Sequence, residues 1–429
     1  MNRNVLLVTP YFPPVTASGA KRPLHLVRNL PEFGWNPIVL ASPCEEGPGD
    51  AHLEAAIPAG RSVSRGYWSG LRGRSTDTPA PRKPSKPGRF AALKRNNHWK
   101  YLTPFDRFLV DTPHGIHEAL RLIDTHAPEV LHVIADPWSV LPAGDVLHTL
   151  TGLPLVVDLR DPWSQHDGKM ALRPQISRAF LRWYERHVFK RSACVVLNTE
   201  AARDAYIEAY RGIIPADRFH AVRNAYDEDL FDPPEVTPPD PVFTVMYFGT
   251  FRLFVEPEAL LRAFERFVKT HEVPVGTARL RFVGGLRPED HTRIAALGLT
   301  GFVDAVDAVP FRKSLGLLRQ ADVLSLVIQP DCPLQIPGKL YDYLGARRFI
   351  LGLSANTEVN QILAKTGAGV GVPWGDDATA ADLLGRLYAA KRATGSIGFD
   401  THLDLAPFSA RAQAAAMAGI YEAATRARR

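Results

Sequence analysis

Short, continuous apolar runs recur along the chain and alternate with longer segments whose apolar residues have helical spacing. The runs at 5–9, 129–135 and 323–328 are mostly apolar, without a strict alternation, as is typical of strands buried on both faces of a parallel sheet. The segments 113–126 and 257–269 place apolar residues three and four positions apart, which predicts helices. This alternation predicts an α/β fold with parallel sheets.

The alternation begins again near the middle of the chain, after a proline-rich stretch. Residues 232–241 hold proline at five of ten positions, which predicts a stiff, exposed linker. We therefore expect two doubly wound, Rossmann-like domains facing a central cleft, one at 1–231 and one at 242–405. The remaining residues, 406–429, have the alanine-rich spacing of a helix.

The stretch 321–353 carries the most chemistry. It reads as a strand, a proline-containing loop, a helix that starts at Pro337 and a second strand. Such a loop and helix start lie at the carboxyl edge of a parallel sheet, where open α/β folds bind ligands. The helix start carries a partial positive charge, and Lys339 adds a full one. We predict a phosphate site here, with Asp342 about one turn further on to accept hydrogen bonds from sugar hydroxyls.

Two other strand ends carry glycine. Gly19 follows the first strand and precedes a helix, which predicts a second phosphate contact; the alternative is an ordinary strand-to-helix turn. Gly249 and Thr250 follow the strand at 243–248, where glycine permits close approach of the backbone. Arg252 comes next and is within reach of a diphosphate at this edge.

Two aspartates end strands of the first half. Asp136 is interpreted either as a helix N-cap or as part of a catalytic site. Asp161 lies in the phrase Asp-Leu-Arg-Asp-Pro-Trp at 158–163, where its pair with Arg160 is either functional or purely structural. His132 lies inside a strand and is interpreted as a core residue.

Other candidate groups are assigned structural roles. The helix at 176–191 carries an aromatic stripe that includes Phe180 and Trp183, which we interpret as core packing. Asp376 and Asp377 are interpreted as a helix cap in preference to a metal pair. The three cysteines are too widely spaced for a disulfide framework or a metal motif, and they fit a reducing cytoplasm.

The composition is that of a globular protein with a local excess of positive charge. No apolar run approaches the ~20 residues that span a bilayer, and the start lacks a signal-peptide core, so we expect a cytoplasmic protein. Much of the net charge of +6 comes from the basic segment 61–107, which also contains Tyr67 and Trp68. We interpret this segment first as a partly disordered loop. The second interpretation is a contact with the anionic inner face of a membrane, and the third is a nucleic-acid site.

Several phrases together resemble GT-B glycosyltransferases of a family-4-like kind. Residues 337–344, Pro-Gly-Lys-Leu-Tyr-Asp-Tyr-Leu, resemble the donor-binding segment of that family. The phrase at 11–35 resembles its amino-terminal signature, and the phrase at 158–163 recurs in one branch of it. The resemblance implies transfer of a hexose from a nucleoside-diphosphate sugar to a hydroxyl acceptor with retention, in glycan, polysaccharide or glycolipid biosynthesis.

The resemblance also implies roles for individual residues. Arg252, Lys339, Asp136 and Asp161 are the predicted catalytic residues. The predicted donor-binding residues are Gly19, Gly249, Thr250, Val309, Pro310, Ile336, Pro337, Gly338, Tyr341 and Asp342. The family needs no bound metal or other cofactor. Its leaving phosphate itself deprotonates the acceptor, so no strong side-chain base is required. Its C-terminal segment packs back on the first domain, and the basic segment 61–107 favours a lipid-linked acceptor.

Other functions remain open at this point. The chain lacks a histidine that many relatives have after the strand at 129–135, and it has Leu334 where the family often has a glutamate. These departures keep a non-catalytic, sugar-nucleotide-binding subunit as an alternative. A nucleotide-sugar epimerase or hydrolase on the same fold is another, and a solute-binding protein is disfavoured by the missing export signal.

Overall fold

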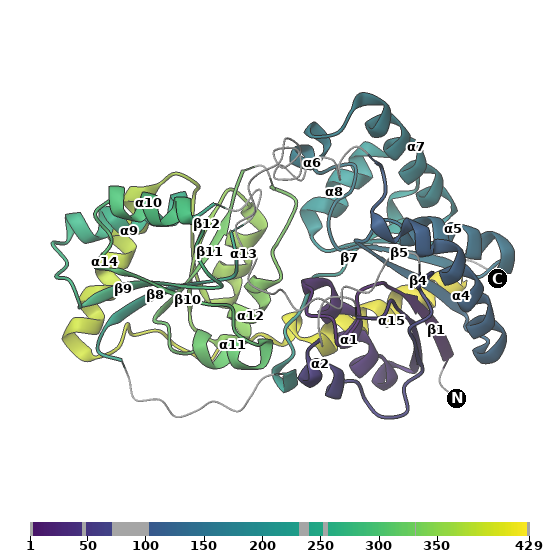
Figure 1. Cartoon of the computed structure of the whole chain (residues 1–429), viewed down its shortest axis with the longest axis horizontal. Helices are drawn as coiled ribbons and strands as arrows, with labels where there is room; N and C mark the ends of the chain where they lie inside the picture. Colours follow the sequence, from purple (N-terminus) through teal and green to yellow (C-terminus); the bar gives the residue numbers. More distant parts are fainter. Residues whose placement is uncertain are drawn as a thin grey trace. The chain divides into compact units, whose positions relative to one another are not determined.

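The computed structural model describes residues 3–44, 49–70, 103–230, 240–251, 256–330 and 332–426. They form two compact units, drawn in Figure 1. Unit 1 comprises residues 1–224 and 410–429, and unit 2 comprises residues 225–409. Most of the predicted linker at 232–241 lies outside the described residues.

Unit 1 is built on a parallel sheet with the strand order β3-β2-β1-β4-β5-β6-β7. Its strands are β1 (Arg3–Val8), β2 (Trp35–Leu40), β3 (Val63–Ser64), β4 (Val130–Ala135), β5 (Leu155–Leu159), β6 (Cys194–Leu197) and β7 (Phe219–Ala221). Its helices are α1 (Lys21–Asn29), α2 (Ala51–Ala55), α4 (Thr112–His126), α5 (Val140–Thr151), α6 (Asp167–Ala171), α7 (Gln175–Arg191), α8 (Glu200–Ala209) and α15 (Ala410–Arg426).

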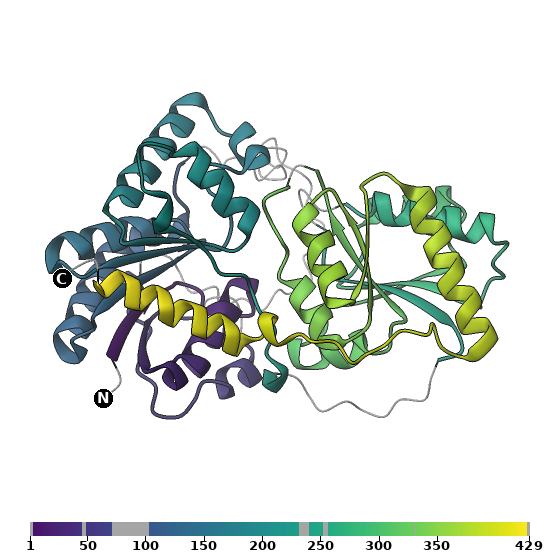
Figure 2. The same cartoon turned by 180° about the vertical axis from the view of Figure 1, so that it is seen from behind.

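Helices cover both faces of the unit 1 sheet. Neighbouring residues of β4 point to opposite faces. His132 is fully buried and its Nδ1 lies 2.7 Å from the hydroxyl of Tyr421 on α15, which confirms that His132 is a core residue. On the other face Val133 packs so closely against Gly144 of α5 that a Cβ there would lie 2.7 Å away. Figure 2 shows α15 lying along unit 1, although it follows unit 2 in the sequence.

Unit 2 repeats this architecture with the strand order β10-β9-β8-β11-β12-β13, again parallel. Its strands are β8 (Phe243–Phe248), β9 (Ala278–Val283), β10 (Val303–Val306), β11 (Val323–Ile328), β12 (Phe349–Ser354) and β13 (Gly369–Val372). Its helices are α9 (Glu258–Thr270), α10 (Pro288–Ala296), α11 (Phe311–Leu318), α12 (Lys339–Ala346), α13 (Thr357–Thr366) and α14 (Asp377–Thr394). Asp376 caps α14 by accepting from the N–H of Thr379 at 3.0 Å, as expected. The two parallel α/β sheets confirm the predicted fold class.

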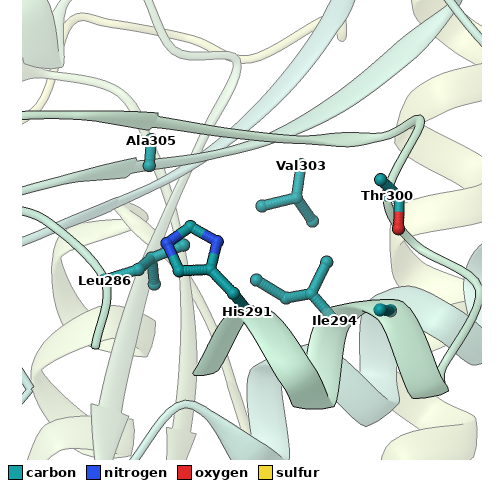
Figure 3. A pocket seen from close by; sticks show the side chains of 7 residues that line it. Leu286, His291, Ile294, Thr300, Val303 and Ala305 are labelled. Atoms are coloured by element: carbon teal, nitrogen blue, oxygen red, sulfur yellow. The ribbon is translucent and has the colours of Figure 1, made fainter. Parts of the chain in front are cut away.

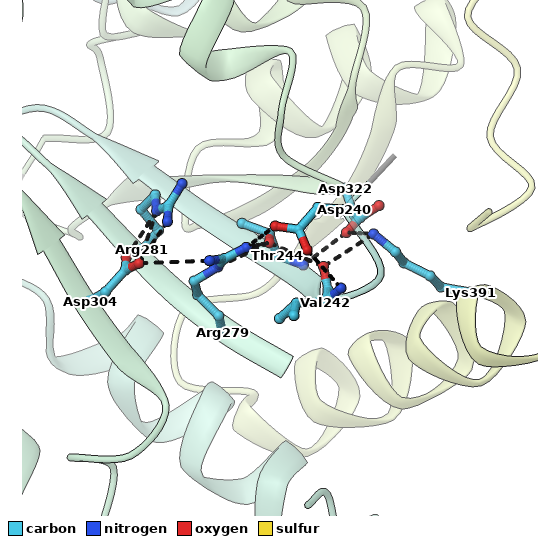
Figure 4. A network of polar contacts seen from close by, with 8 residues as sticks. All are labelled: Asp240, Val242, Thr244, Arg279, Arg281, Asp304, Asp322 and Lys391. Carbon is cyan, nitrogen blue, oxygen red and sulfur yellow. Dashed lines mark hydrogen bonds and ion pairs between the residues drawn. The ribbon is translucent and has the colours of Figure 1, made fainter. Parts of the chain in front are cut away.

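A charged network ties together the amino-terminal edge of the unit 2 sheet (Figure 4). Lys391 of α14 donates to a carboxylate oxygen of Asp322 at 2.6 Å and to the carbonyl of Val242 at 3.1 Å. Arg281 of β9 pairs with Asp304 of β10 at 2.7 Å. These charges pair with one another across neighbouring elements, so we assign this edge a structural role.

The stripe predicted on α7 is core packing only in part: Val188 is buried, whereas the aromatic residues Phe180 and Trp183 are exposed, contrary to the expectation. Trp183 is 60% exposed and Phe180 is 40% exposed, whereas Leu181, Val188 and Phe189 form the buried side of the helix. Helical spacing identifies residues that share a side, but it does not say which side meets the sheet.

The basic segment is described only at its two ends. Tyr67 is fully buried, its carbonyl accepts from the hydroxyl of Ser42 at 2.9 Å, and its own hydroxyl lies 3.1 Å from that of Thr112. Tyr67 is therefore part of the core and not of a surface patch. Residues 71–102 lie outside the described residues, so their predicted contacts remain predictions. Among the described helices, none has the length and apolar character of a membrane span.

Candidate functional site

The carboxyl edge of the unit 2 sheet has the topology of a ligand site. The chain runs outward from β8 through β9 to β10, then returns to the other side of β8 and continues through β11 to β13. The connections after β8 and β11 therefore leave the sheet on opposite sides. Open α/β sheets bind ligands at such a topological switch point. Gly249 and Thr250 follow β8 here, and α12 follows β11.

Lys339 brings a positive charge to this switch point. Its Nζ lies 2.7 Å from the hydroxyl of Tyr247 and 4.1 Å from the centre of that ring. A Cβ built on Gly249 would lie 3.1 Å from the same Nζ, and Gly249 has a φ of +124°, which favours glycine. The ammonium group thus lies beside backbone that carries no side chain, so a phosphate oxygen can approach both.

Tyrosines fix α12 against β8. The backbone N–H of Phe248 donates to the hydroxyl of buried Tyr343 at 3.0 Å. Tyr247 packs in the core under α9 and α14, whereas α12 packs in the core on the other face of the sheet. The side chain of Lys339 therefore extends past the end of the sheet to Tyr247 on its other face. The hydrogen bond to Tyr247 holds the ammonium group at the end of β8. A Cβ on Gly284, at the end of β9, would lie 2.8 Å from the carbonyl carbon of Gly249. The ends of both strands therefore require glycine.

The start of α12 differs in detail from the prediction. The helix begins at Lys339, with Gly338 as N-cap and no side chain capping it. Pro337 precedes the cap, and its carbonyl accepts from the N–H of Leu340 at 3.0 Å, so the proline forms a tight entry turn. The partial positive charge of the helix start is therefore not neutralised by a capping carboxylate.

The predicted donor-binding residues divide into two groups. Thr250 and Gly338 are exposed and Asp342 is half-buried, so these three are accessible at the edge. Ile336 and Tyr341 are only 2% and 0% exposed, respectively. Both pack in the core around α12, because this short helix is buried on most of its sides. Their side chains therefore face the core, and their predicted contact with the donor stays a prediction.

Of three further predicted residues, two follow β10 at the same carboxyl edge of the unit 2 sheet, and one cannot be placed. Val309 and Pro310 form the connection between β10 and α11, where Pro310 is the N-cap of the helix. Arg252 lies outside the described residues, so its predicted role remains a prediction.

A cavity of about 230 Å³ lies beside α10 and β10 (Figure 3). His291 and Ile294 of α10 and Val303 and Ala305 of β10 contribute to its lining. None of the predicted donor-binding residues lines it. This cavity is therefore distinct from the site at Lys339.

Unit 1 has its own switch point, between β1 and β4. Gly19 lies in the connection after β1, and Asp136 follows β4 directly. Arg160, after β5, joins the two, because one of its terminal nitrogens donates to the carbonyl of Asp136 at 3.0 Å. A Cβ on Gly19 would lie 2.4 Å from the other terminal nitrogen, so glycine leaves room for the guanidinium. Gly19, Asp136 and Arg160 thus meet at one edge.

Asp136 is a candidate acid or base and not a helix cap. The N-cap of α5 is Ser139, which removes the alternative interpretation. Burial raises the pKa of the Asp136 carboxyl, although the positive charges of Arg160 and Lys169 oppose that shift. Burial and the nearby Asp136 charge also raise the pKa of Tyr11 to about 12. Asp161 lies at the same edge, with a carboxylate oxygen 4.0 Å from Nζ of Lys169.

A buried ion pair lies beneath this edge. Arg22, in the first turn of α1, donates to Asp158 of β5 at 2.6 Å, and both side chains are almost completely buried. Burial alone would raise the pKa of Asp158, but the charge of Arg22 and a hydrogen bond from His132 hold it below its usual value. The guanidinium also donates to the carbonyl of Val222 at 3.0 Å. Arg22 therefore fixes the start of α1 to the sheet instead of contacting a ligand.

Residues 19–225 match the family described as "Glycosyl transferase 4-like domain". This region, just under half of the chain, is therefore similar to family-4-like glycosyltransferases. No curated protein sequence matches it.

Solved structures share the fold of this chain over nearly its whole length. Sucrose-phosphate synthase from Thermosynechococcus elongatus has a TM-score of 0.62 at 14% identity, covering 99% of this chain and 100% of that one. HepE from Anabaena in complex with UDP and glucose has a TM-score of 0.61 at 14% identity, covering 98% and 100%. A structure described as a UDP-N-acetylglucosamine 2-epimerase from Listeria monocytogenes has a TM-score of 0.55 at 11% identity, covering 96% and 94%. At these identities the likeness concerns the fold alone.

Sequence reasoning missed the residues that hold the candidate sites in place. Tyr247 and Tyr343 position Lys339 and α12, and Lys169 lies beside Asp161. The signal for Tyr247 was a polar hydroxyl near the end of a mostly apolar strand, two residues before Gly249. No comparable signal marks Lys169, because the turn that brings α6 back to the edge is not evident in the sequence.

Proposed function

We propose that the chain transfers a hexose from a nucleoside-diphosphate sugar to a hydroxyl acceptor. The supporting observation is the Lys339 ammonium beside Gly249, at the switch point of the unit 2 sheet. When the bond between the anomeric carbon and the diphosphate breaks, negative charge develops on the leaving oxygen. Lys339 and the uncapped start of α12 stabilise that charge. Asp342 accepts hydrogen bonds from the ribose hydroxyls.

The reaction is proposed to proceed with retention. The acceptor oxygen bonds to the anomeric carbon as the carbon–diphosphate bond breaks, and the acceptor proton moves to an oxygen of the leaving phosphate. Unit 1 supplies the acceptor side, where the polar groups at the ends of β4 and β5 orient the hydroxyl. Asp136, with its raised pKa, and Asp161 are the carboxyls available there. No metal or other cofactor takes part in this scheme.

The first test is binding of the donor. The HepE structure contains UDP, so UDP and UDP-glucose are the first probes, followed by GDP, ADP and their sugars. A ligand at 100 times its Kd stabilises the unit that binds it by about 2.7 kcal/mol, which a thermal-shift assay detects. We expect a shift with at least one of these nucleotides, which Lys339→Ala reduces and the exposed Lys365→Ala on α13 does not. The absence of any shift would remove the basis of the proposal.

The second test separates transfer from the alternative functions. Hydrolysis of the donor without acceptor separates an enzyme from a binding subunit. A glycosylated product formed with an acceptor identifies a glycosyltransferase and excludes a hydrolase. Binding without turnover identifies a non-catalytic subunit. Conversion of a nucleotide sugar to its epimer identifies an epimerase, a class that shares this fold.

A further inference from the structure

The outer side of α7 exposes large apolar side chains. Ile176, Phe180 and Trp183 are 83%, 40% and 60% exposed. They are four and three residues apart, so they lie on one side of the helix. We call this surface the α7 face. A soluble domain seldom exposes a large aromatic ring and two further apolar side chains side by side without a partner.

A row of positive charges runs beside the α7 face. Arg182, Arg186 and Lys190 are all exposed and follow one another at intervals of four residues. The nearby carboxylates are already engaged. Glu185 is buried and accepts from Ser164, Tyr206 and Tyr210, and Asp145 of α5 pairs with Arg191 at 2.8 Å. The α7 face is therefore apolar along its middle and cationic along one border.

Exposed apolar side chains continue on the neighbouring helix α5. Arg191 joins the two helices, since it binds both Asp145 and the hydroxyl of Thr149 at 2.5 Å. On α5, Val146 and Leu150 are 41% and 61% exposed. Figure 1 shows α5 and α7 together in unit 1. Apolar side chains are thus exposed on both of these neighbouring helices.

A chain of aromatic contacts connects the α7 face to the carboxyl edge of the unit 1 sheet. Phe180 packs against Phe105, with ring centres 6.2 Å apart, and Phe105 packs against Trp163 at 5.8 Å. Trp163 stacks on Trp138 at 5.1 Å, and these two residues follow Asp161 and Asp136 closely in the sequence. Whatever binds the α7 face is therefore held at a fixed position relative to that edge.

We propose that the α7 face docks on an anionic lipid surface. The rings of Trp183 and Phe180 suit the boundary between headgroups and acyl chains, and the arginine row pairs with lipid phosphates. A second copy of this chain would bring like charges together. Residues 71–102 of the same chain carry nine Lys or Arg against one acidic residue, Asp77, so they also have the wrong sign to neutralise the row. The proposal concerns attachment alone and does not depend on sugar transfer.

The test is sedimentation of the full chain with phosphatidylcholine vesicles, with and without phosphatidylglycerol, in the absence of any nucleotide. We expect binding that requires phosphatidylglycerol and weakens as salt is raised. Two double variants should each lower the partition coefficient for anionic vesicles at least about tenfold. One combines Ile176→Ser with Trp183→Ser, and the other combines Arg182→Glu with Arg186→Glu. The emission of Trp183 is obtained by subtracting the tryptophan fluorescence spectrum of Trp183→Phe from that of the native chain. This emission should shift to shorter wavelength on vesicle binding.

Matched control variants lie in unit 2. Val275→Ser removes an apolar side chain that is 67% exposed, and Arg386→Glu with Arg392→Glu reverses two exposed charges on α14. These controls should bind vesicles as the native chain does, and circular dichroism should show that every variant is folded. Equal binding to neutral and anionic vesicles, or unchanged binding by both α7 variants, would overturn the proposal. A third result would also overturn the proposal. In it, the native chain does not bind vesicles, and light scattering shows a dimer that dissociates when Ile176→Ser and Trp183→Ser are combined.

Discussion

Lys339 is the side chain on which donor chemistry most depends. Its ammonium is held 2.7 Å from the hydroxyl of Tyr247, beside bare backbone at Gly249. Lys339→Ala should lower kcat/KM at least about 30-fold, a loss of roughly 2 kcal/mol of transition-state stabilisation. Tyr247→Phe should cost less, because the ring remains and only the hydrogen bond that orients the ammonium is lost. Release of the nucleoside diphosphate measures both effects, and native turnover by Lys339→Ala would refute the assignment.

Asp136 predicts a pH dependence at the other strand edge. Burial raises its pKa above the ordinary value for an aspartate. If the ionised carboxylate orients the acceptor, kcat/KM falls on acidification through that raised pKa, and it is fully restored above it. Asp136→Asn should be less active throughout and should lose this acid limb. The measurement is kcat/KM from pH 4.5 to 8. An acid limb that is identical in the variant would assign the titration to another group.

At the scale of elements, the contact between α1 and α15 predicts a pH-dependent stability. Burial, assisted by the charges of Lys21 and Arg28, lowers the pKa of His25 in α1 to about 3. Between pH 6.5 and 3 the unfolded chain binds a proton at His25 that the folded chain does not. Stability is therefore complete above pH 6.5 and falls by about 1.4 kcal/mol per pH unit below it.

The comparison with His25→Gln isolates this contribution, since the other histidines are unchanged. Urea unfolding between pH 5 and 7 should show a shallower decline for the variant, even where the variant is less stable overall. Equal slopes for the two proteins would mean that His25 is protonated in the folded state.

Elements were predictable where one physical requirement determined the sequence. The strand β11, Val323–Ile328, was predicted with its observed bounds, because burial on both faces of a parallel sheet demands a continuous apolar run. The exposure of the outer side of α7 could not be predicted. The spacing of Phe180 and Trp183 is the same whether that side meets the sheet or solvent. In the site, the charge of Lys339 could be read from its place after a strand. Its partner Tyr247 could not, because that contact passes round the edge of a sheet between distant segments.

At the scale of the whole molecule, unit 1 is built from two separate segments of the sequence. Removing the C-terminal segment should therefore lower the stability of unit 1 but not that of unit 2. A chain ending at residue 409 keeps all of unit 2 but removes α15 from unit 1. Unit 1 then loses the burial of Met417, Ile420 and Tyr421, at about 1.5–3 kcal/mol each. The sum is roughly the whole stability of an ordinary domain.

The thermal unfolding of the truncated chain should therefore lose the transition of unit 1. The transition of unit 2 should remain and still rise when UDP or UDP-glucose is added, because Lys339, Asp342 and the start of α12 all lie between 225 and 409. Of the predicted phosphate contacts, only Gly19 lies in unit 1. Tyr421→Phe is the matched control, since it removes only the hydroxyl that contacts His132 and should cost about 1 kcal/mol. Loss of the nucleotide response on truncation would mean that donor binding needs unit 1. An unchanged unit 1 transition would mean that α15 contributes little to its core.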